Sequence, residues 1–207
     1  MNPRQARADR RRIVISAAIA LPALAIVVAI VIFNNRQVQN ASVATALATI
    51  SVGQRAPEFA VSTTSGLFDL AKAGGKPTLL EVFATWCPHC QRETAVLDRV
   101  HAKYGERVNV IAVSGAADNV DRTAPESQAD VVAFADTYKA TYPIAFDPNL
   151  DVAHKYLQGG FPTITLIGRD GNVAAIREGE VPEADFVKAL DAALVGKKPD
   201  PKMGFKG

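Results

Sequence analysis

The chain has 207 residues, which suits one compact domain of ordinary size with additional segments. A hydrophobic fraction of 48% excludes a disordered chain, and two cysteines exclude both a disulfide-dense mini-protein and a four-thiolate metal site. The net charge is +2, but the charge is unevenly distributed along the chain. Residues 1–12 contribute +4 and residues 197–207 contribute +3, so residues 13–196 carry −5. The body of the protein is therefore mildly acidic, which gives no support to nucleic-acid binding.

Residues 13–33 form an uncharged apolar stretch that directly follows a cluster of arginines. As a helix at ~1.5 Å per residue, this stretch would be about 31 Å long, which matches the hydrocarbon core of a bilayer. The positive-inside rule then keeps residues 1–12 in the cytoplasm. The sequence therefore predicts a single-pass anchor in a bacterial inner membrane, with the domain on the extracytoplasmic side.

Two alternatives to this anchor stay open. A cleaved signal peptide is one, because 44–46 and 46–48 (ATA and ALA) have the small-x-small pattern of a cleavage site. These sites lie more than ten residues beyond the apolar stretch, which is also long for a signal peptide. A buried core helix is the other alternative.

Residues 34–52 are mostly small and polar, which predicts a linker before a folded domain over 53–196 and a basic flexible tail over 197–207. Strands are expected at 58–62, 67–70, 78–84, 107–114, 144–146, 163–168 and 173–178. Helices are expected at 88–104, 129–141, 150–157 and 184–195. The apolar run at 78–84 (TLLEVFA) is typical of a strand buried on both faces, and Asp170-Gly171 is a strong hairpin signal. This order predicts an α/β fold with a mixed sheet and helices on both faces.

Both cysteines lie in Trp86-Cys87-Pro88-His89-Cys90, where the buried strand meets the first long helix. Pro88 suits the first helical position, where its missing N–H costs nothing, and this puts Cys87 at the N-cap. The free N–H groups and the helix dipole favour a thiolate on Cys87, and a protonated His89 would add a positive charge nearby. Cys90, one turn further, is expected to be more buried and to resolve a mixed disulfide. The spacing predicts redox activity.

Three further roles for the cysteine motif fit the sequence less well. A zinc half-site would need two more ligands, and His101 and His154 are the only histidines outside the motif; both fit solvated helix positions better. A purely structural disulfide across so short a loop would add little stability. Two inert core cysteines would leave the proline at the helix start without a purpose.

Residues 83–90 (FATWCPHC) resemble the active-site segment of thioredoxin-fold proteins, and further features resemble the membrane-tethered TlpA/ResA-like thiol–disulfide oxidoreductases. The first of these features is residues 53–59 (GQRAPEF), which match a G-x-x-A-P-x-F pattern. The others are residues 142–144 (YPI) together with 147–148 (DP), and residues 160–163 (GFPT). The match covers about 53–195. It implies a thioredoxin-like fold that exchanges disulfides with protein thiols, without a cofactor or bound metal and with a membrane redox partner.

The resemblance also implies roles for particular residues. Pro162 falls where the fold carries a cis proline, and Phe161 before it would form an apolar docking surface with Trp86 and Pro88. The alternative is that Trp86 and Phe161 are plain core residues. His89 completes a Pro-His pair that is associated with oxidising DsbA-like proteins.

Two glutamates are further candidates. Glu81 stands six residues before Cys87, where thioredoxins carry an acidic residue, and could take and return the Cys90 proton. An ion pair with a basic side chain such as Lys103 is its alternative role. Glu93, three residues after Cys90, matches an active-site glutamate of the ResA-like proteins, and its alternative is a solvated position beside Arg92.

Two functions compete with disulfide exchange. A peroxiredoxin would need P-x-x-x-[ST]-x-x-C, whereas Leu80 and Ala84 stand at the positions of that proline and hydroxyl residue. A copper chaperone of related fold typically spaces its cysteines one residue further apart. The direction of exchange stays open, because the anchor resembles reductive proteins, including those that act in cytochrome c maturation, while Pro-His resembles oxidising ones.

Overall fold

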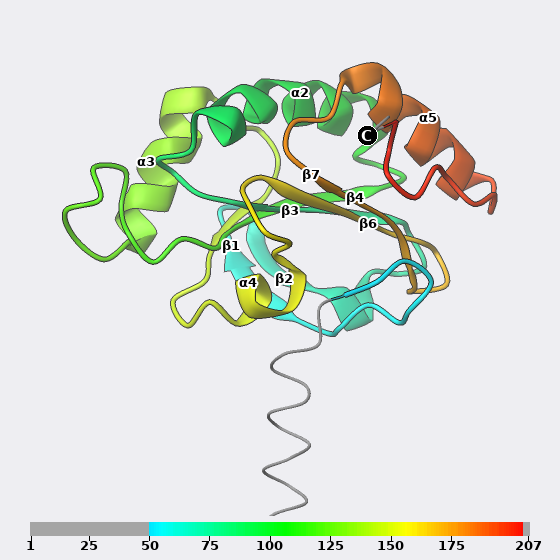
Figure 1. The fold of residues 1–207 in the computed structure, drawn as a ribbon, viewed down its shortest axis with the longest axis horizontal. Coiled ribbons are helices and arrows are strands. Elements are labelled where there is room, and N and C mark those ends of the chain that lie inside the picture. The colour runs from blue at the N-terminus through cyan, green and yellow to red at the C-terminus, as the bar shows by residue number, and fades with distance from the viewer. Residues whose placement is uncertain (1–49, 205–207) are drawn as a thin grey trace, which may run out of the picture. The chain divides into compact units, whose positions relative to one another are not determined.

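The computed structural model describes residues 50–204, which build one seven-stranded sheet (Figure 1). The strand order is β2-β1-β5-β4-β3-β6-β7; β3–β4 and β4–β5 are parallel, and the other neighbouring pairs are antiparallel. The strands are β1 (Ala60–Thr63), β2 (Gly66–Asp69), β3 (Thr78–Phe83), β4 (Asn109–Ser114), β5 (Ile144–Phe146), β6 (Thr163–Ile167) and β7 (Val173–Glu178).

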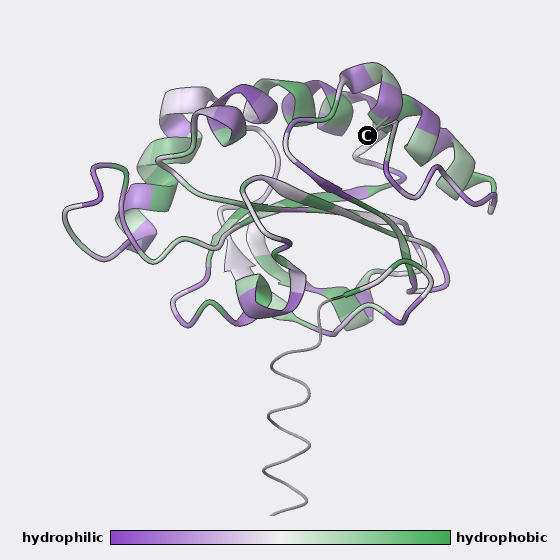
Figure 2. Ribbon diagram, viewed as in Figure 1, coloured by the Kyte–Doolittle hydropathy of each residue, from purple (hydrophilic) through white to green (hydrophobic). Residues whose placement is uncertain are grey.

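Helices cover both faces of this sheet. Figure 1 shows α2, α3 and α5 on one face and α4 on the other. Their bounds are α2 (Pro88–Tyr104), α3 (Gln128–Tyr138), α4 (Asp151–Tyr156) and α5 (Glu183–Leu194), and a 3-10 helix, η1 (Leu70–Lys72), follows β2. The core accordingly forms two clusters, one on each face of the sheet, and Figure 2 shows hydrophobic residues along the central strands. The predicted mixed α/β, thioredoxin-like fold is confirmed.

All six residues of β3 are buried, as its apolar run predicts. Side chains alternate between the two faces of a strand. Leu79 and Phe83 join the cluster that contains the buried residues of α2, whereas Leu80 and Val82 join the other cluster. Glu81 therefore lies on the α2 face, in the middle of the molecule.

The residues before β1 bind to the β6–β7 hairpin. Gly53 and Ala56 donate backbone N–H groups to the carbonyls of Val173 and Gly171, at 2.7 and 3.0 Å. Gly171 has a φ of +77°, and a Cβ there would lie 2.5 Å from Nη1 of Arg55, so this turn needs glycine. Arg55 in turn donates to the carbonyl of Asp170 at 2.9 Å.

The structure corrects several boundaries. The largest change is in α3, which ends at Tyr138 and not at 141, because Lys139 takes a left-handed conformation (φ 55°) that closes the helix. β1 begins at Ala60, two residues later than expected, and β2 ends at Asp69, whose side chain caps η1. β4 begins at Asn109 rather than at 107, because residues 107 and 108 close the end of α2 with N–H bonds to the carbonyl of Tyr104.

The expected flexible tail over 197–207 is wrong for residues 197–204. The N–H of Ile176 in β7 donates to the carbonyl of Pro201 at 2.9 Å, and Met203 is 1% exposed in the α2-side core. The segment folds back onto the domain because this buries the apolar side chain of Met203 and gives the N–H of Ile176, on the outer edge of β7, a hydrogen-bond partner.

The predicted membrane anchor at 13–33 and most of the linker lie outside the described residues. Within residues 50–204, every helix is too short or too polar to cross a bilayer.

Candidate active site

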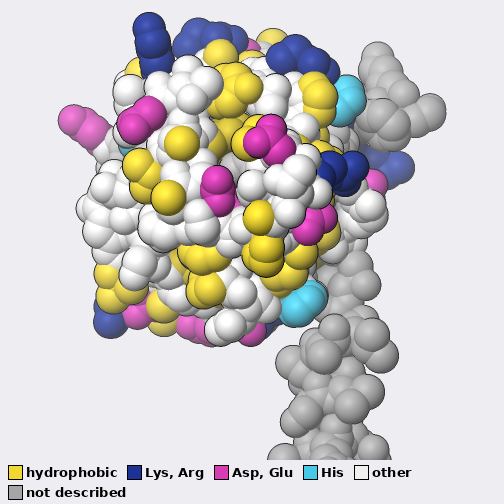
Figure 3. Space-filling view, turned by 90° about the vertical axis from the view of Figure 1, so that its left-hand side faces the viewer, with side chains coloured by type: hydrophobic (Ala, Val, Ile, Leu, Met, Phe, Trp, Pro, Cys, Tyr) yellow, Lys and Arg dark blue, Asp and Glu magenta, His cyan; other side chains and the backbone are white. Residues whose placement is uncertain are grey.

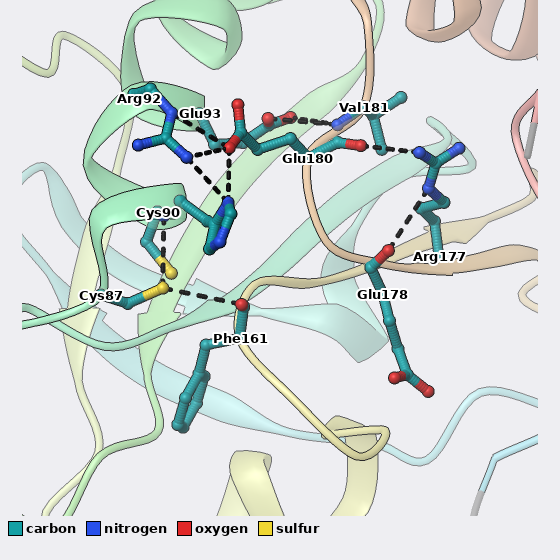
Figure 4. A network of polar contacts seen from close by, with 10 residues as sticks. Cys87, Cys90, Arg92, Glu93, Phe161, Arg177, Glu178, Glu180 and Val181 are labelled. Carbon is teal, nitrogen blue, oxygen red and sulfur yellow. Dashed lines mark hydrogen bonds and ion pairs between the residues drawn. The ribbon is translucent and has the colours of Figure 1, made fainter.

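Cys87 is the N-cap of α2, with extended backbone angles (φ −82°, ψ 116°), and Pro88 opens the helix as predicted. The N–H of Cys90 donates to the Cys87 sulfur at 3.4 Å, and the same sulfur lies 3.6 Å from the carbonyl oxygen of Phe161 (Figure 4). Both cysteines are free thiols, 4% and 0% exposed respectively. The sulfur of Cys87 is thus nearer the surface and held by two backbone groups.

The Cys90 thiol lies in the interior against the sheet. Burial is the largest cause that raises its pKa far above the ordinary value for cysteine, and the negative charge of Glu81 raises it further. Cys90 therefore stays protonated at neutral pH, so this thiol could act as a nucleophile only with the help of a base.

The carboxyl group whose charge acts on Cys90 belongs to Glu81, which is 1% exposed. Its Oε1 has no hydrogen-bond partner within residues 50–204. Burial raises its pKa well above the ordinary range, and the charges of Glu93 and Cys87 add to the rise. The ammonium of Lys103 lies over the ring of Tyr104 at 5.2 Å instead, and Glu81 has no ion pair in the described part of the chain. The ion-pair alternative for Glu81 is wrong.

Glu93 is also buried, at 1% exposure, so the alternative of a solvated position is wrong. The N–H of Val181 donates to both of its oxygens, at 3.4 and 3.2 Å. Burial raises the pKa of Glu93 to about 8, although this hydrogen bond acts in the opposite direction. At neutral pH Glu93 is therefore mostly protonated and can exchange a proton.

His89 does not stand alone beside the thiol. Its Nδ1 lies 2.6 Å from Oε1 of Glu180, and the guanidinium of Arg92 donates to the same oxygen at 3.1 and 2.5 Å (Figure 4). The hydrogen bond from Arg92 is the largest cause that lowers the pKa of Glu180, and His89 contributes less. Glu180, on the loop after β7, thus balances the positive charges next to Cys87. Glu180 was not among the residues predicted from the sequence, because no local pattern connects residues 91 positions apart.

The Phe161–Pro162 peptide bond is cis, as the resemblance implied. The ring of Phe161 meets that of Trp86 edge-on, with 5.6 Å between ring centres, and the guanidinium of Arg122 lies 3.9 Å from the centre of the Trp86 ring. Trp86 and Phe161 are half-buried, which suits a docking surface more than a plain core. Figure 3, which views the molecule from the left-hand side of Figure 1, shows hydrophobic side chains interspersed with polar and charged ones across that face.

The loop that carries Arg122 is fixed by a buried carboxyl group. Glu126, 7% exposed, accepts hydrogen bonds from the hydroxyl of Thr85, at 2.7 Å, and from that of Ser114. Burial raises its pKa, although both hydroxyl groups oppose the rise. Its own N–H donates to the carbonyl of Ala117 at 2.9 Å, so the loop is tied to the ends of β3 and β4. Neither Arg122 nor Glu126 stood out in the sequence, since both lie in a polar loop.

The remaining histidines lie elsewhere: His101 near the end of α2 and His154 exposed on α4. Within residues 50–204, no three side chains among His, Cys, Asp and Glu come close enough to hold a metal ion.

Proteins that place two cysteines in this way, at a helix start and beside a cis proline, exchange disulfides with other thiols. Fold and site together thus define a thiol–disulfide oxidoreductase. The chain belongs to the AhpC/TSA family, whose model matches residues 52–176.

Named relatives agree with this class. The chain is 32% identical over 143 residues to the thioredoxin-like protein YneN of Bacillus subtilis, covering 69% of this chain and 80% of that protein. It is 30% identical over 145 residues to the thiol-disulfide oxidoreductase ResA of Geobacillus thermodenitrificans, covering 69% and 78%. A thiol:disulfide interchange protein from Chlorobium tepidum superposes with a TM-score of 0.55 at 29% identity, covering 71% and 99%. The resemblance to TlpA/ResA-like proteins is confirmed.

Proposed function

We propose that this oxidoreductase reduces disulfides of extracytoplasmic proteins, with Cys87 as the attacking thiolate and Cys90 as the resolving thiol. The observation that carries the assignment is the different placement of the two sulfurs. That of Cys87 lies at the N-cap, nearer the surface and beside the backbone of Phe161, whereas that of Cys90 is fully buried.

The reaction has two exchange steps. The Cys87 thiolate attacks one sulfur of the substrate disulfide, a bond forms between them, and the other substrate sulfur leaves as a thiolate. Cys90 then gives up its proton and attacks the Cys87 sulfur. The Cys87–Cys90 disulfide forms as the second substrate thiolate leaves, so the protein loses two electrons and the substrate gains them. Phe161 and Trp86 would hold the substrate chain in place during both steps.

Glu81 is the base that we assign to the second step, acting in its deprotonated form, since the negative charge of that form acts on Cys90. We assign Glu93 as a second proton carrier, because its charge acts on Glu81 and burial raises its own pKa to about 8. When the disulfide forms, the proton of Cys90 passes to Glu81, and it returns when the disulfide is reduced again.

The contact between His89 and Glu180 favours the reductive direction. A free imidazolium beside Cys87 would stabilise the thiolate, hence the reduced form, and would make the couple more oxidising. Glu180 places a negative charge against both His89 and Arg92 instead. We therefore expect a lower reduction potential than the Pro-His pair alone suggests.

The predicted anchor at 13–33 would hold the domain at the outer face of a bacterial inner membrane, near a membrane partner that returns electrons to it. Substrates would then be extracytoplasmic proteins with accessible disulfides, apocytochromes c among them. Protease added to spheroplasts should digest residues 34–207, whereas protection of the domain or release of a soluble form starting near residues 43–49 would contradict the anchor.

The direction is tested by the reduction potential of the full chain against glutathione. A value near that of thioredoxin, about −270 mV, supports a reductant, and a value near that of DsbA, about −120 mV, contradicts it.

A further inference from the structure

Arg122 is a cation beside the candidate active site whose charge has no acidic partner. Its guanidinium lies 3.9 Å from the centre of the Trp86 ring. In the part of the chain that the structure describes, this guanidinium forms no ion pair and no hydrogen bond, although Asp118 and Asp121 lie on the same loop. Stacking engages the flat face of a guanidinium and leaves the N–H donors at its edge free to bind an acceptor.

The backbone of the loop holds Arg122 in a conformation that few side chains adopt. The loop joins β4 to α3 and stands out at the left of Figure 1. The φ of Arg122 is +57°, in the left-handed region. The side chain of Asn119 accepts the N–H groups of Thr123 and Ala124, and its carbonyl accepts that of Arg122 at 3.0 Å. The two ends of the segment 118–125 pair with each other. Backbone strain that is fixed in this way is concentrated at functional sites.

The cations near Cys87 on the first turn of α2 are arranged differently. His89 and Arg92 both contact the carboxylate of Glu180, so the chain itself supplies their counter-charge. For Arg122, the described residues supply an aromatic ring and no carboxylate. A guanidinium whose position is fixed and whose charge is unpaired fits an anionic group that arrives with a substrate.

A chain of contacts connects Arg122 with the reactive sulfur. Sγ of Cys87 lies 3.6 Å from the carbonyl oxygen of Phe161. The ring of Phe161 meets that of Trp86 edge-on at 5.6 Å, and the guanidinium of Arg122 lies over Trp86. A substrate segment in extended conformation would pass these groups as it pairs with the backbone of Phe161. Its side chains point the same way at every second residue, about 7 Å apart, so a neighbour of the attacked cysteine would come near the guanidinium.

We propose that Arg122 is a specificity-determining residue that binds a carboxylate of the substrate, on an aspartate or glutamate close to the cysteine that Cys87 attacks. The inference rests on the proposed function and names its class of substrate: proteins whose accessible disulfides are flanked by acidic side chains. A guanidinium can form two parallel, charge-assisted hydrogen bonds with a carboxylate. Arg122 takes no part in the bond changes themselves, and no proton or electron passes through it.

The test compares three disulfide-linked peptide dimers as substrates of the reduced full chain. Each monomer carries one cysteine and, two positions away on both sides, glutamate, glutamine or lysine. Chromatography after an acid quench measures the peptide thiol that is released in a single turnover, which gives a second-order rate constant. We expect the glutamate peptide to react about fivefold faster than the glutamine peptide at physiological salt, and the lysine peptide to react more slowly than both.

Variants of Arg122 separate its charge from its place in the loop. In Arg122→Gln, the rate ratio of the glutamate to the glutamine peptide should fall by about fivefold. Arg122→Glu should reverse the order and favour the lysine peptide. The matched control is Arg107→Gln, because Arg107 also lies over an aromatic ring, at 5.3 Å from the centre of Tyr104. It follows the far end of α2, a helix about 25 Å long, so this variant should keep the ratio of the unaltered chain.

A ratio that Arg122→Gln leaves unchanged, or that falls equally in Arg107→Gln, would overturn the inference. So would an equal slowing of all three peptides, since a purely structural role of the loop does not depend on the charge of the substrate. A cooperative unfolding transition checks that the variants fold. If the glutamine and glutamate variants do not, Arg122→Lys, which keeps the charge, must still prefer the glutamate to the lysine peptide, and loss of that order counts against the role. Failure of the proposed function looks different: Cys87→Ala would still release thiol from all three peptides.

Discussion

The sulfur of Cys87 lies 3.6 Å from the carbonyl oxygen of Phe161, although 74 positions separate the two residues. The thiol that we propose as the attacking group therefore lies beside a backbone carbonyl of the loop that precedes β6. A substrate segment in extended conformation could pair with this backbone and bring its own sulfur in line with Cys87. In the proposed reaction, these two residues would together determine where the substrate disulfide lies.

This arrangement predicts that the two cysteines react unequally. Iodoacetamide added to the reduced chain at neutral pH should label Cys87 much faster, because Cys90 is fully buried and its pKa is raised. Cys90→Ala should accumulate mixed disulfides with substrates, and Cys87→Ala should not. Mass spectrometry of the labelled peptides checks both statements, and preferential labelling of Cys90 would reverse the assignment.

The buried Glu93 predicts a pH-dependent stability. Its pKa is about 8 in the folded protein, above the ordinary value of 4.5, so between these values the folded chain holds a proton that the unfolded chain has lost. The free energy of unfolding should therefore fall as pH rises from about 4.5 to 8, by at most about 1.4 kcal/mol per unit from this group. Urea titrations at several pH values should show a shallower fall for Glu93→Gln. An unchanged slope would mean that Glu93 is charged in the fold.

Glu180 should lower the reduction potential. Glu180→Gln removes a negative charge near the Cys87 thiolate and frees Arg92 and His89, so the reduced form gains stability and the potential should rise by about 10–30 mV. His89→Ala should change it in the opposite direction, by less. Glu183→Gln is the control, because Glu183 also pairs with an arginine, Arg99, at 2.7 Å. Equal effects of the two glutamine variants would contradict the role of Glu180.

Glu126 should affect the environment of Trp86 indirectly, by holding the loop that places Arg122 over the Trp86 ring. Glu126→Ala removes the tie between the loop and the ends of β3 and β4 and leaves the hydroxyls of Thr85 and Ser114 without their acceptor, which should cost about 1–3 kcal/mol of stability. Because Trp86 is the only tryptophan in the chain, its fluorescence reports the loss of Arg122 from its ring. Arg122→Gln should give a similar spectral change without the loss of stability, and Arg169→Gln should give neither.

Local signals account for what could be predicted from the sequence. The bounds of α2 agree with the prediction because Pro88 opens it and Gly105 closes it, and β3 follows from its apolar run. The cysteine pair, the cis Pro162 and the two buried glutamates were candidates because each lies at a fixed distance from the motif or in a matching segment.

What the sequence could not provide depends on contacts between distant segments. Glu180 reaches His89 only because the loop after β7 passes beside the start of α2. Lys103 likewise contacts the ring of Tyr104 and not a carboxylate, because the direction of its side chain depends on which groups surround the end of α2.

The hydrogen bond from Ile176 to Pro201 determines where the C-terminal segment can be truncated without uncovering the sheet. β7 is the last strand of the sheet, and an uncovered outer strand is a template on which a second molecule can add its own strand. Residues 200–203 occupy part of that position and bury Met203. A shortened version that stops at Gly196, after the end of α5, would uncover this edge of β7 and should associate with itself more readily than the chain that keeps residues 200–203.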